Sequence, residues 1–369
     1  MDRKVLENAI LTLGRDSALL TRFKAAPADV GGELGLDAEW AGVINGGDRD
    51  RLRSAGVNDG ITILVSRWFR DNVADSDSRG RFYVDPDIMP GVPDIPKNLV
   101  FAGGCSHVPD LLARPEIDPA ESVGRLMEGY EKLRQMIAAA DPELLLVTTD
   151  CHFQSFGTSA FVVGTGPRHV GDMAFFKRKD LDLELRGAPE AAQRVIDVVR
   201  ARGLEVEAAS TVELDHGLIV PLRLLLPRSD LPIVPIVTQP ARSFSPFGAR
   251  AFGEALRDFI ESSGKRVGVL ATGGLSHWLD PGKFGFVDVE FDTYVLNLLG
   301  AGRGLDLARL EPYPLLDHGQ YEILNWILML GVVGDGVRGD VYAYEPMTAS
   351  GGGWTVVNML LDDKERFHA

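Results

Sequence analysis

Residues 144–156 read LLLVTTDCHFQSF, an apolar run that turns polar at its carboxyl end and is followed closely by a histidine. A short apolar run of this kind, closed by polar residues, is typical of a strand buried on both faces. In α/β proteins the carboxyl ends of such strands border the ligand-binding crevice. We therefore expect a central strand here whose end carries His152 toward a binding site.

The same pattern recurs through the rest of the chain. Strands are predicted at residues 99–102, 143–149, 159–163, 233–237 and 267–271. Between and after them, apolar residues at helical spacing predict amphipathic helices at residues 120–140, 189–202, 246–263, 291–299 and 321–333. This alternation predicts an α/β domain with a central, mostly buried sheet flanked by helices, which we assign to residues 98–369.

The first part of the chain has a different pattern. Residues 1–70 read as short helices, with Asp37 as the N-cap of a helix over 38–44 that ends at Gly46. Residues 71–97 contain four prolines, which exclude a regular helix or a central strand: Pro86, Pro90, Pro93 and Pro96. We expect a small all-helical N-terminal domain joined to the α/β domain by an extended connector.

Composition limits the possible partners and compartment. The 369 residues include 38 Lys and Arg against 53 Asp and Glu, a formal charge of −15, which disfavours nucleic acid or an anionic membrane as the partner. The chain has no apolar stretch long enough to span a bilayer, and its first residues lack the apolar core of a signal peptide. Two cysteines, Cys105 and Cys151, cannot build a disulfide framework. A cytoplasmic protein is the simplest expectation.

Four of the seven histidines lie near predicted strand ends or in glycine-rich turns: His107, His152, His216 and His277. A single histidine in such a place is more often a hydrogen-bonded structural residue than a catalytic one. Four with the same placement favour a shared site, because strand ends meet at one edge of the sheet.

Glu322 lies in the apolar segment GQYEILNWILMLGVV, where an unpaired buried carboxylate would be costly. The simpler alternative is an acid in the first turn that complements the helix N-terminus. Two neutral imidazoles and one carboxylate form the facial triad suited to non-haem Fe(II), and His107, His152 and Glu322 are one such set. His318, four residues before Glu322, is a competing ligand, although nearby prolines and Gly319 favour a loop there.

Other motifs with a known chemistry are absent from the sequence. There is no GxGxxG dinucleotide fingerprint, no P-loop and no GxSxG nucleophile elbow. Cys105 and Cys151 lie beside the candidate ligands, but packing explains them as well as catalysis does.

Several segments together resemble the class III extradiol ring-cleaving dioxygenases, the protocatechuate 4,5-dioxygenase superfamily. They are SHVP around His107, the strand ending at His152, LDHGLIVPL, TGGLSH, VEFD at 289–292 and the late segment with Glu322. Residues 1–70 resemble the small helical subunit of that enzyme, particularly through LGLDAEWAGVINGGDRDRLRSAGV. The chain thus resembles the two subunits fused, with the small one first.

The resemblance implies a function and a role for each residue. His107, His152 and Glu322 match the Fe(II) ligands, His277 matches the catalytic acid/base, and His216 matches a pocket histidine that contacts substrate or bound oxygen. The implied activity is the insertion of O2 into a catechol-like ring in aromatic catabolism, with the small aromatic substrate and O2 as partners. The small helical domain would cover the pocket, and association into a homodimer is expected.

The resemblance leaves the substrate open among protocatechuate, gallate, other catechols, aminophenols and dihydroxypyridines. A carboxylated substrate would need donors, for which Arg168, Lys177, Arg178 and Ser350 are candidates. Ser350 also matches a substrate-binding region of the family. Two other functions stay open: a Zn²⁺-dependent hydrolase on the same scaffold, and a binding protein that has lost its metal.

Overall fold

A computed structural model describes residues 1–15, 17–57, 65, 95–154, 156–226, 230–278, 282–310 and 312–361. These residues form two compact units, one made of the N-terminal helices and one that contains the sheet. The predicted connector lies mostly outside the described residues, so the division at residues 71–97 stays a prediction. No helix in the described part of the chain is both long enough and apolar enough to cross a membrane.

The N-terminal unit is built of short helices. They are α1 (Arg3–Arg15), α2 (Ser17–Ala25), α3 (Pro27–Glu33), α4 (Ala38–Asn45) and α5 (Arg49–Ser54). The Asp37 side chain caps α4 by accepting from the Trp40 backbone N–H at 2.8 Å, and Gly46 follows its last turn. Leu6, Ile10 and Phe23 are fully buried in the core that these helices share. The predicted helical character and the cap at Asp37 are confirmed.

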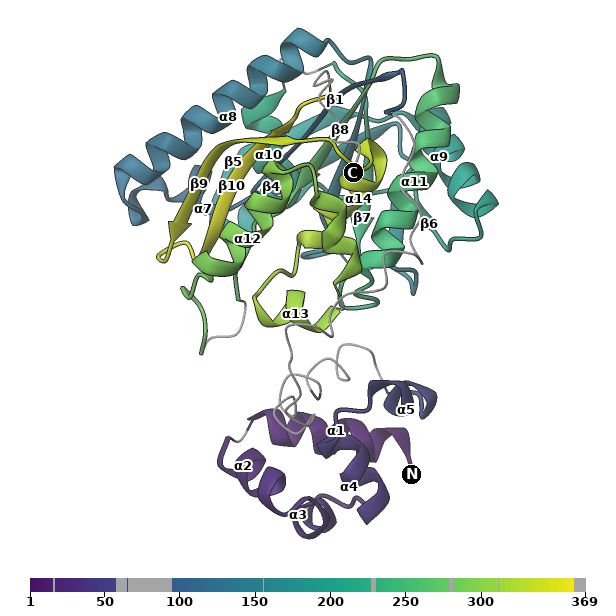
Figure 1. Ribbon diagram of the computed structural model, residues 1–369, viewed down its shortest axis with the longest axis vertical. Helices are drawn as coiled ribbons and strands as arrows, with labels where there is room; N and C mark the ends of the chain where they lie inside the picture. The colour runs from purple at the N-terminus through teal and green to yellow at the C-terminus, as the bar shows by residue number, and fades with distance from the viewer. Residues whose placement is uncertain are drawn as a thin grey trace. The chain divides into compact units, whose positions relative to one another are not determined.

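The second unit has a central eight-stranded sheet in the order β6-β3-β7-β2-β8-β1-β10-β9 (Figure 1). Its strands are β1 (Leu99–Cys105), β2 (Leu144–Asp150), β3 (Phe161–Gly164), β6 (Glu207–Ala209), β7 (Ile233–Thr238), β8 (Val267–Thr272), β9 (Gly339–Met347) and β10 (Gly352–Met359). The four central strands, β7, β2, β8 and β1, are parallel, whereas β9 and β10 add antiparallel. Every residue of β2 is buried. The predicted α/β class and buried sheet are confirmed.

Some elements were not predicted. A separate two-stranded sheet pairs β4 (Arg168–Met173) with β5 (Arg178–Arg186), and α10 (His216–Leu225) follows β6. The strands β9 and β10 were not predicted either: β9 mixes polar and apolar residues, and β10 begins with two glycines.

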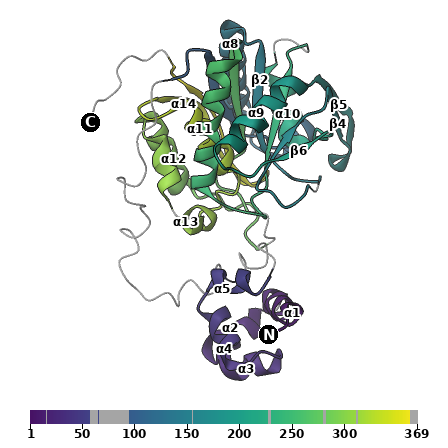
Figure 2. The same cartoon turned by 90° about the vertical axis from the view of Figure 1, so that its right-hand side faces the viewer.

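Helices cover both faces of the sheet. The larger ones are α8 (Ala120–Ala140), α9 (Pro189–Ala201), α11 (Pro246–Ser263), α12 (Val289–Gly300) and α14 (Ile323–Val333). One face is packed by α8 and α10, and on the other α14 lies against β8, β2 and β1. Helix α11 contacts both α14 and α9 (Figure 2). The shorter elements of this unit are α7 (Asp110–Ala113), α13 (Pro312–Asp317), η3 (Pro115–Ile117), η4 (Ala174–Phe176) and η5 (Gly304–Arg309).

Helix α14 begins beside the carboxyl ends of the parallel strands, and small residues allow it to pack closely. A Cβ atom on Gly253 of α11 would lie 2.0 Å from the carbonyl oxygen of Leu328 and 2.9 Å from Cα of Gly331. On the sheet side, a Cβ atom on Gly104 would lie 2.5 Å from the ring of Trp326. The residues just before α14 are therefore held firmly beside the carboxyl ends of β1 and β8.

Candidate active site

Three of the predicted site histidines converge on one carboxylate oxygen. His107 lies two residues after β1 and His152 two residues after β2, and their Nε2 atoms are 3.0 and 3.9 Å from Oε1 of Glu322. His277, in the loop after β8, has its Nε2 atom 3.2 Å from the same oxygen. The parallel strands thus bring together residues that are far apart in sequence, as the strand-end placement predicts.

Glu322 precedes α14 rather than lying inside the helix, which corrects the predicted helix over 321–333. It occupies the N-cap position but makes no side-chain capping hydrogen bond. Its Oε2 atom instead accepts from the backbone N–H of Gly274 at 2.5 Å. Gly273 has φ of +143°, and a Cβ atom there would lie 2.8 Å from Cβ of Glu322. The alternative that Glu322 only complements the helix N-terminus is therefore wrong.

The second ring nitrogen of each of these histidines is held from outside the cluster. Nδ1 of His152 lies 3.0 Å from Oδ2 of Asp215, and Nδ1 of His277 lies 3.2 Å from the carbonyl oxygen of Leu275. Because both partners only accept, each Nδ1 carries the proton and each Nε2 is left to face Glu322. Nδ1 of His107 is 3.2 Å from Oγ1 of Thr272.

Asp215 and Thr272 are site residues that sequence reasoning missed. Asp215 is the N-cap of α10, where its Oδ1 accepts from the Gly217 N–H while Oδ2 accepts from the Nδ1–H of His152. The signal was present in the motif LDHG, whose aspartate precedes a helix. Outer partners of this kind fix the tautomer and orientation of metal-binding histidines.

His216 belongs to the same cluster but occupies a different position. It is the first residue of α10, and its ring centroid lies 4.1 Å from that of His152 and 5.4 Å from that of His107. These three imidazoles each offer a ring nitrogen within 4.8 Å of the others, which is a second possible metal-binding group. Nδ1 of His216 is buried and has no hydrogen-bond partner among the described residues.

Electrostatics favours a cation in the middle of the cluster. Burial lowers the pKa of His152, but the carboxylates of Asp215 and Glu322 outweigh burial and raise that pKa to about 10. Burial raises the pKa of Glu322, but the neighbouring His107 and His277 hold it well below its ordinary value. The buried carboxylates therefore stabilise positive charge on the imidazoles that face them, and those imidazoles stabilise the negative charge of Glu322.

The pKa values of His216, His277 and Asp150 are also shifted, each for a different reason. Burial, together with the charges of His152 and His107, lowers the pKa of His216 well below its ordinary value, which keeps this imidazole neutral. Burial also lowers the pKa of His277, but the carboxylate of Glu322 outweighs it and gives a net increase. Asp150, at the end of β2, is buried and close to Glu322, which raises its pKa to about 6.

Two other candidates make contacts outside the cluster. His318 lies in the loop after α13, as its prolines predict, where its Nδ1 is 2.6 Å from Oδ2 of Asp288 and its ring stacks on Phe291. Cys105 is buried at the end of β1, and burial raises the pKa of its thiol. Neither residue is brought to Glu322 by these contacts.

A second buried carboxylate, Asp292 of α12, fixes the loop that carries His277. Its side chain accepts from the backbone N–H and hydroxyl of Ser276 at 2.9 and 2.8 Å. It also accepts from the Gln320 amide at 2.7 Å and from the Tyr344 hydroxyl at 2.8 Å. Asp292 therefore ties together the residues just before His277 and those just before Glu322.

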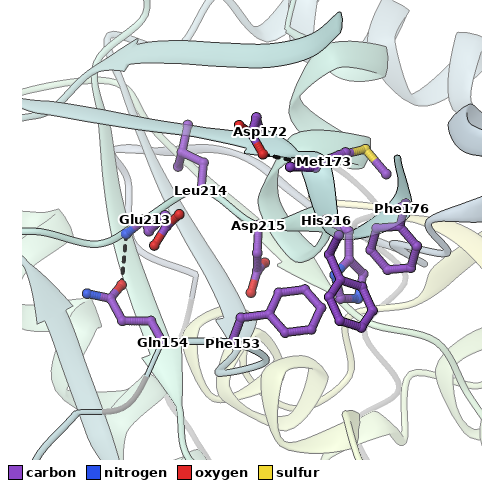
Figure 3. Close-up of a pocket in the computed structure, with 11 residues that line it drawn as sticks. Phe153, Gln154, Asp172, Met173, Phe176, Glu213, Leu214, Asp215 and His216 are labelled. Atoms are coloured by element: carbon purple, nitrogen blue, oxygen red, sulfur yellow. Dashed lines mark hydrogen bonds between the residues drawn. The ribbon is translucent and has the colours of Figure 1, made fainter. Parts of the chain in front are cut away.

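A cavity of about 250 Å³ opens beside His216 (Figure 3). The rings of Phe153 and Phe176 lie next to the imidazole, with centroids 5.5 and 5.1 Å from it. Asp215, which holds His152, lines the same cavity. The position of this cavity suits an aromatic ligand whose ring reaches the histidine cluster.

Most of the residues considered for binding a carboxylated substrate make hydrogen bonds or salt bridges to other residues of the chain. Arg168 pairs with Glu184, and Arg178 binds Asp180 and the Leu112 carbonyl. Ser350 accepts from the indole N–H of Trp354 at 2.8 Å, and the centroid of the Trp354 ring lies 5.9 Å from that of His277.

The comparisons with known proteins agree with this geometry. The family described as the catalytic LigB subunit of aromatic ring-opening dioxygenase matches residues 102–356. This match covers more than half of the chain and includes His107, His152, His277 and Glu322. The chain belongs to the LigB family, within the class III extradiol dioxygenase superfamily.

Curated relatives carry the name 2,3-dihydroxyphenylpropionate/2,3-dihydroxicinnamic acid 1,2-dioxygenase. The protein from Rhodococcus rhodochrous is 34% identical over 166 residues, which is 43% of this chain and 51% of the relative. The Pseudomonas putida protein is 32% identical over 198 residues, or 51% of this chain and 60% of the relative. The chain thus spans about half to three fifths of the length of these relatives. A crystal structure of an uncharacterized Escherichia coli K12 protein aligns with a TM-score of 0.46 at 14% identity, covering 63% of this chain and 92% of that one.

Proposed function

We propose that this chain is a non-haem Fe(II)-dependent extradiol dioxygenase that opens a catechol-like aromatic ring. The observation that carries the proposal is the convergence of imidazole Nε2 atoms on one oxygen of the buried Glu322. Membership of the LigB family supports the reaction class. His107, His152 and Glu322 are the proposed ligands, because two imidazoles and one carboxylate leave positions open for substrate and O2.

The residues fit a divalent metal ion. Nε2 of His152 is buried without a hydrogen-bond partner among the described residues, while its Nδ1 is held by Asp215. An unpartnered ring nitrogen that faces a carboxylate is a metal-ligand arrangement. The ion would supply a common binding point for the two adjacent oxygens of a catechol and for O2.

The other side chains then have separate tasks. His277 is the proposed acid/base: its Nδ1 proton is held by the Leu275 carbonyl, so Nε2, which faces Glu322, is the nitrogen that would take a proton from a substrate hydroxyl and return it later. The neutral His216, between the cluster and the cavity, is the proposed contact of the substrate ring. The substrates considered are catechols, aminophenols and dihydroxypyridines, and the named relatives act on a catechol with a carboxylated side chain.

The test is oxygen uptake by the purified protein after anaerobic loading with Fe(II). Catechol, protocatechuate, gallate, 2-aminophenol and a dihydroxypyridine should be compared, with the ring-opened product followed by its absorbance. We expect uptake of one O2 per ring opened by at least one of these compounds, and none by the metal-free protein.

Three results would contradict the proposal in different ways. If the protein binds one iron per chain but takes up no oxygen with any of these compounds, the proposed dioxygenase activity is wrong. Turnover of an ester or amide without O2 by the Zn²⁺-loaded protein would favour the hydrolase. Failure to bind any divalent metal would favour a binding protein that has lost its metal.

A further inference from the structure

The cavity beside His216 is walled by three phenylalanines that form an aromatic box. The Phe153 and Phe175 ring centroids are 4.5 Å apart, those of Phe175 and Phe176 5.2 Å, and those of Phe153 and Phe176 6.3 Å. The box adjoins the histidine cluster, because the Phe153 ring centroid lies 5.5 Å from that of His216 and 6.3 Å from that of His152. A ring bound at the cluster would therefore extend its substituent into the box.

The charged residues that line the cavity are all acidic. Asp172, Glu213 and Asp215 contribute carboxylates, and none of the described lining residues is lysine or arginine. Asp215 is neutralised by its contact with His152. Asp172 is oriented by accepting from the Ala174 N–H at 2.7 Å, and Glu213 is an exposed side chain whose carboxylate has no salt bridge within the described residues.

Basic residues near the box in sequence do not offset these charges. Arg178 is held by Asp180 and by the Leu112 carbonyl, and Arg168 is held by Glu184. Lys177 is exposed and is not among the residues that line the cavity. A substrate carboxylate in the box would thus meet two carboxylates, which are electrostatically unfavourable for an anion, and apolar rings that offer it no hydrogen-bond donor.

We propose that this pocket selects aromatic substrates whose ring substituent is uncharged or cationic, with a short alkylamine as the best fit, and disfavours those with a carboxylate. The proposal rests on the proposed ring-cleaving function and adds the charge of the substituent to it. A cation in the box would be attracted by the carboxylates and, over a ring face, by the aromatic rings as well. An alkyl group would gain only apolar contact with the rings.

The test compares three catechols of matched shape that carry a 2-aminoethyl, a propyl or a 2-carboxyethyl group, each as the 3- and the 4-substituted isomer. For the Fe(II)-loaded protein, kcat/KM should be highest for the amine and lowest for the acid, with a ratio of about tenfold or more between them. The ratio should shrink as ionic strength rises, since the carboxylates at the cavity mouth are partly solvated.

Charge variants locate the source of the selectivity. Asp172→Asn combined with Glu213→Gln should lower the amine-to-acid ratio by about threefold to tenfold. Glu213→Lys should lower the amine-to-acid ratio of kcat/KM more than the double variant does. Glu190→Gln, an exposed acid in the first turn of α9, is the matched control and should leave the ratio unchanged.

Binding without chemistry gives a second readout. Phenethylamine and 3-phenylpropanoate lack ring hydroxyls, so saturation-transfer NMR can report their binding independently of turnover. We expect the amine to bind more tightly and the double variant to remove the difference. If the catechol with the carboxylate is cleaved as fast as the one with the amine, or if 3-phenylpropanoate binds as tightly as phenethylamine, the proposed selectivity is wrong. The proposed dioxygenase activity would not be affected by that result. If no catechol is cleaved and neither probe binds, both proposals fail.

Discussion

Two buried carboxylates hold the loop that carries His277, and their surroundings differ. Glu322 accepts from the Gly274 N–H, and Asp292 accepts from the Ser276 N–H two residues later. The other neighbours of Asp292 are neutral donors, whereas those of Glu322 are imidazoles. Asp292 completes a hydrogen-bond network, whereas Glu322 is surrounded by imidazoles, which can bind a metal ion.

The pKa values of the two groups move in opposite directions. Burial raises the pKa of Asp292, since its hydrogen bonds offset only part of the cost of desolvation. Glu322 is also buried, but the charges of His107 and His277 take its pKa well below the ordinary value. The comparison teaches that burial alone does not mark a functional carboxylate; the charge of its neighbours does. The predictions below separate the two clusters.

The largest effect is expected for Glu322→Gln. The amide keeps the size of the side chain but removes the negative charge that the histidines share, so metal affinity should fall by at least about tenfold to a hundredfold. Activity should fall by about a thousandfold or more, because substrate and O2 lose their common binding point. Iron content and oxygen uptake measure the two losses.

A matched control for that change is Glu345→Gln. Glu345 is also largely buried but pairs with Arg125 rather than with histidines. Its substitution should leave iron content unchanged. If Glu322→Gln retained full iron and full turnover, the ligand role of Glu322 would be wrong.

The variants His277→Ala and His107→Ala should distinguish the proposed acid/base, His277, from a proposed metal ligand, His107. Both imidazoles lie close to the same oxygen of Glu322, at 3.2 and 3.0 Å, so distance alone does not assign their roles. If His277 is the acid/base, its alanine variant keeps iron while turnover falls by about 10²–10⁴. The His107 variant should lose iron as well. Iron loss in both variants would instead make His277 a ligand.

Asp292→Asn should affect folding more than metal binding. The carboxylate oxygens accept all four of its hydrogen bonds, whereas the NH2 group of asparagine can only donate. In the variant this NH2 group must therefore face another donor or force a hydroxyl to turn. We expect a loss of about 1–3 kcal/mol in the free energy of unfolding, measured by urea denaturation of the metal-free protein. Iron content should stay near that of the parent. A variant that is fully stable but lacks iron would place Asp292 in the metal site.

The sequence predicted the central strands because their buried positions form continuous apolar runs, as in LLLV at 144–147. It did not predict α10, since HGLIVPLRLL contains Pro221 and lacks a clear polar face. The pair β4 and β5 was missed because charged residues interrupt its apolar positions. Local pattern thus identified continuous apolar strands and regular amphipathic helices, and it missed elements whose sequence is interrupted by proline, glycine or charged residues.

For the site, strand ends predicted which histidines meet, and the structure brings His107, His152, His216 and His277 together with Glu322. The roles of these residues stay predictions until the variants are measured. Their partners were not predicted, because the contact between Asp215 and His152 depends on how α10 packs against β2. A hydrogen bond between two elements is fixed by tertiary packing, which no local pattern contains.

The smallest effect is expected for Ser350→Ala, which tests the predicted substrate contact. The Ser350 hydroxyl accepts from the Trp354 indole N–H, and the Trp354 ring lies near His277. If Ser350 acts only by orienting that ring, its removal should lower kcat by no more than about fivefold and leave KM unchanged, the cost of one neutral hydrogen bond. A direct contact with substrate would instead raise KM. Ser350→Thr keeps the hydroxyl and should restore kcat in the first case, because the acceptor for the indole N–H returns.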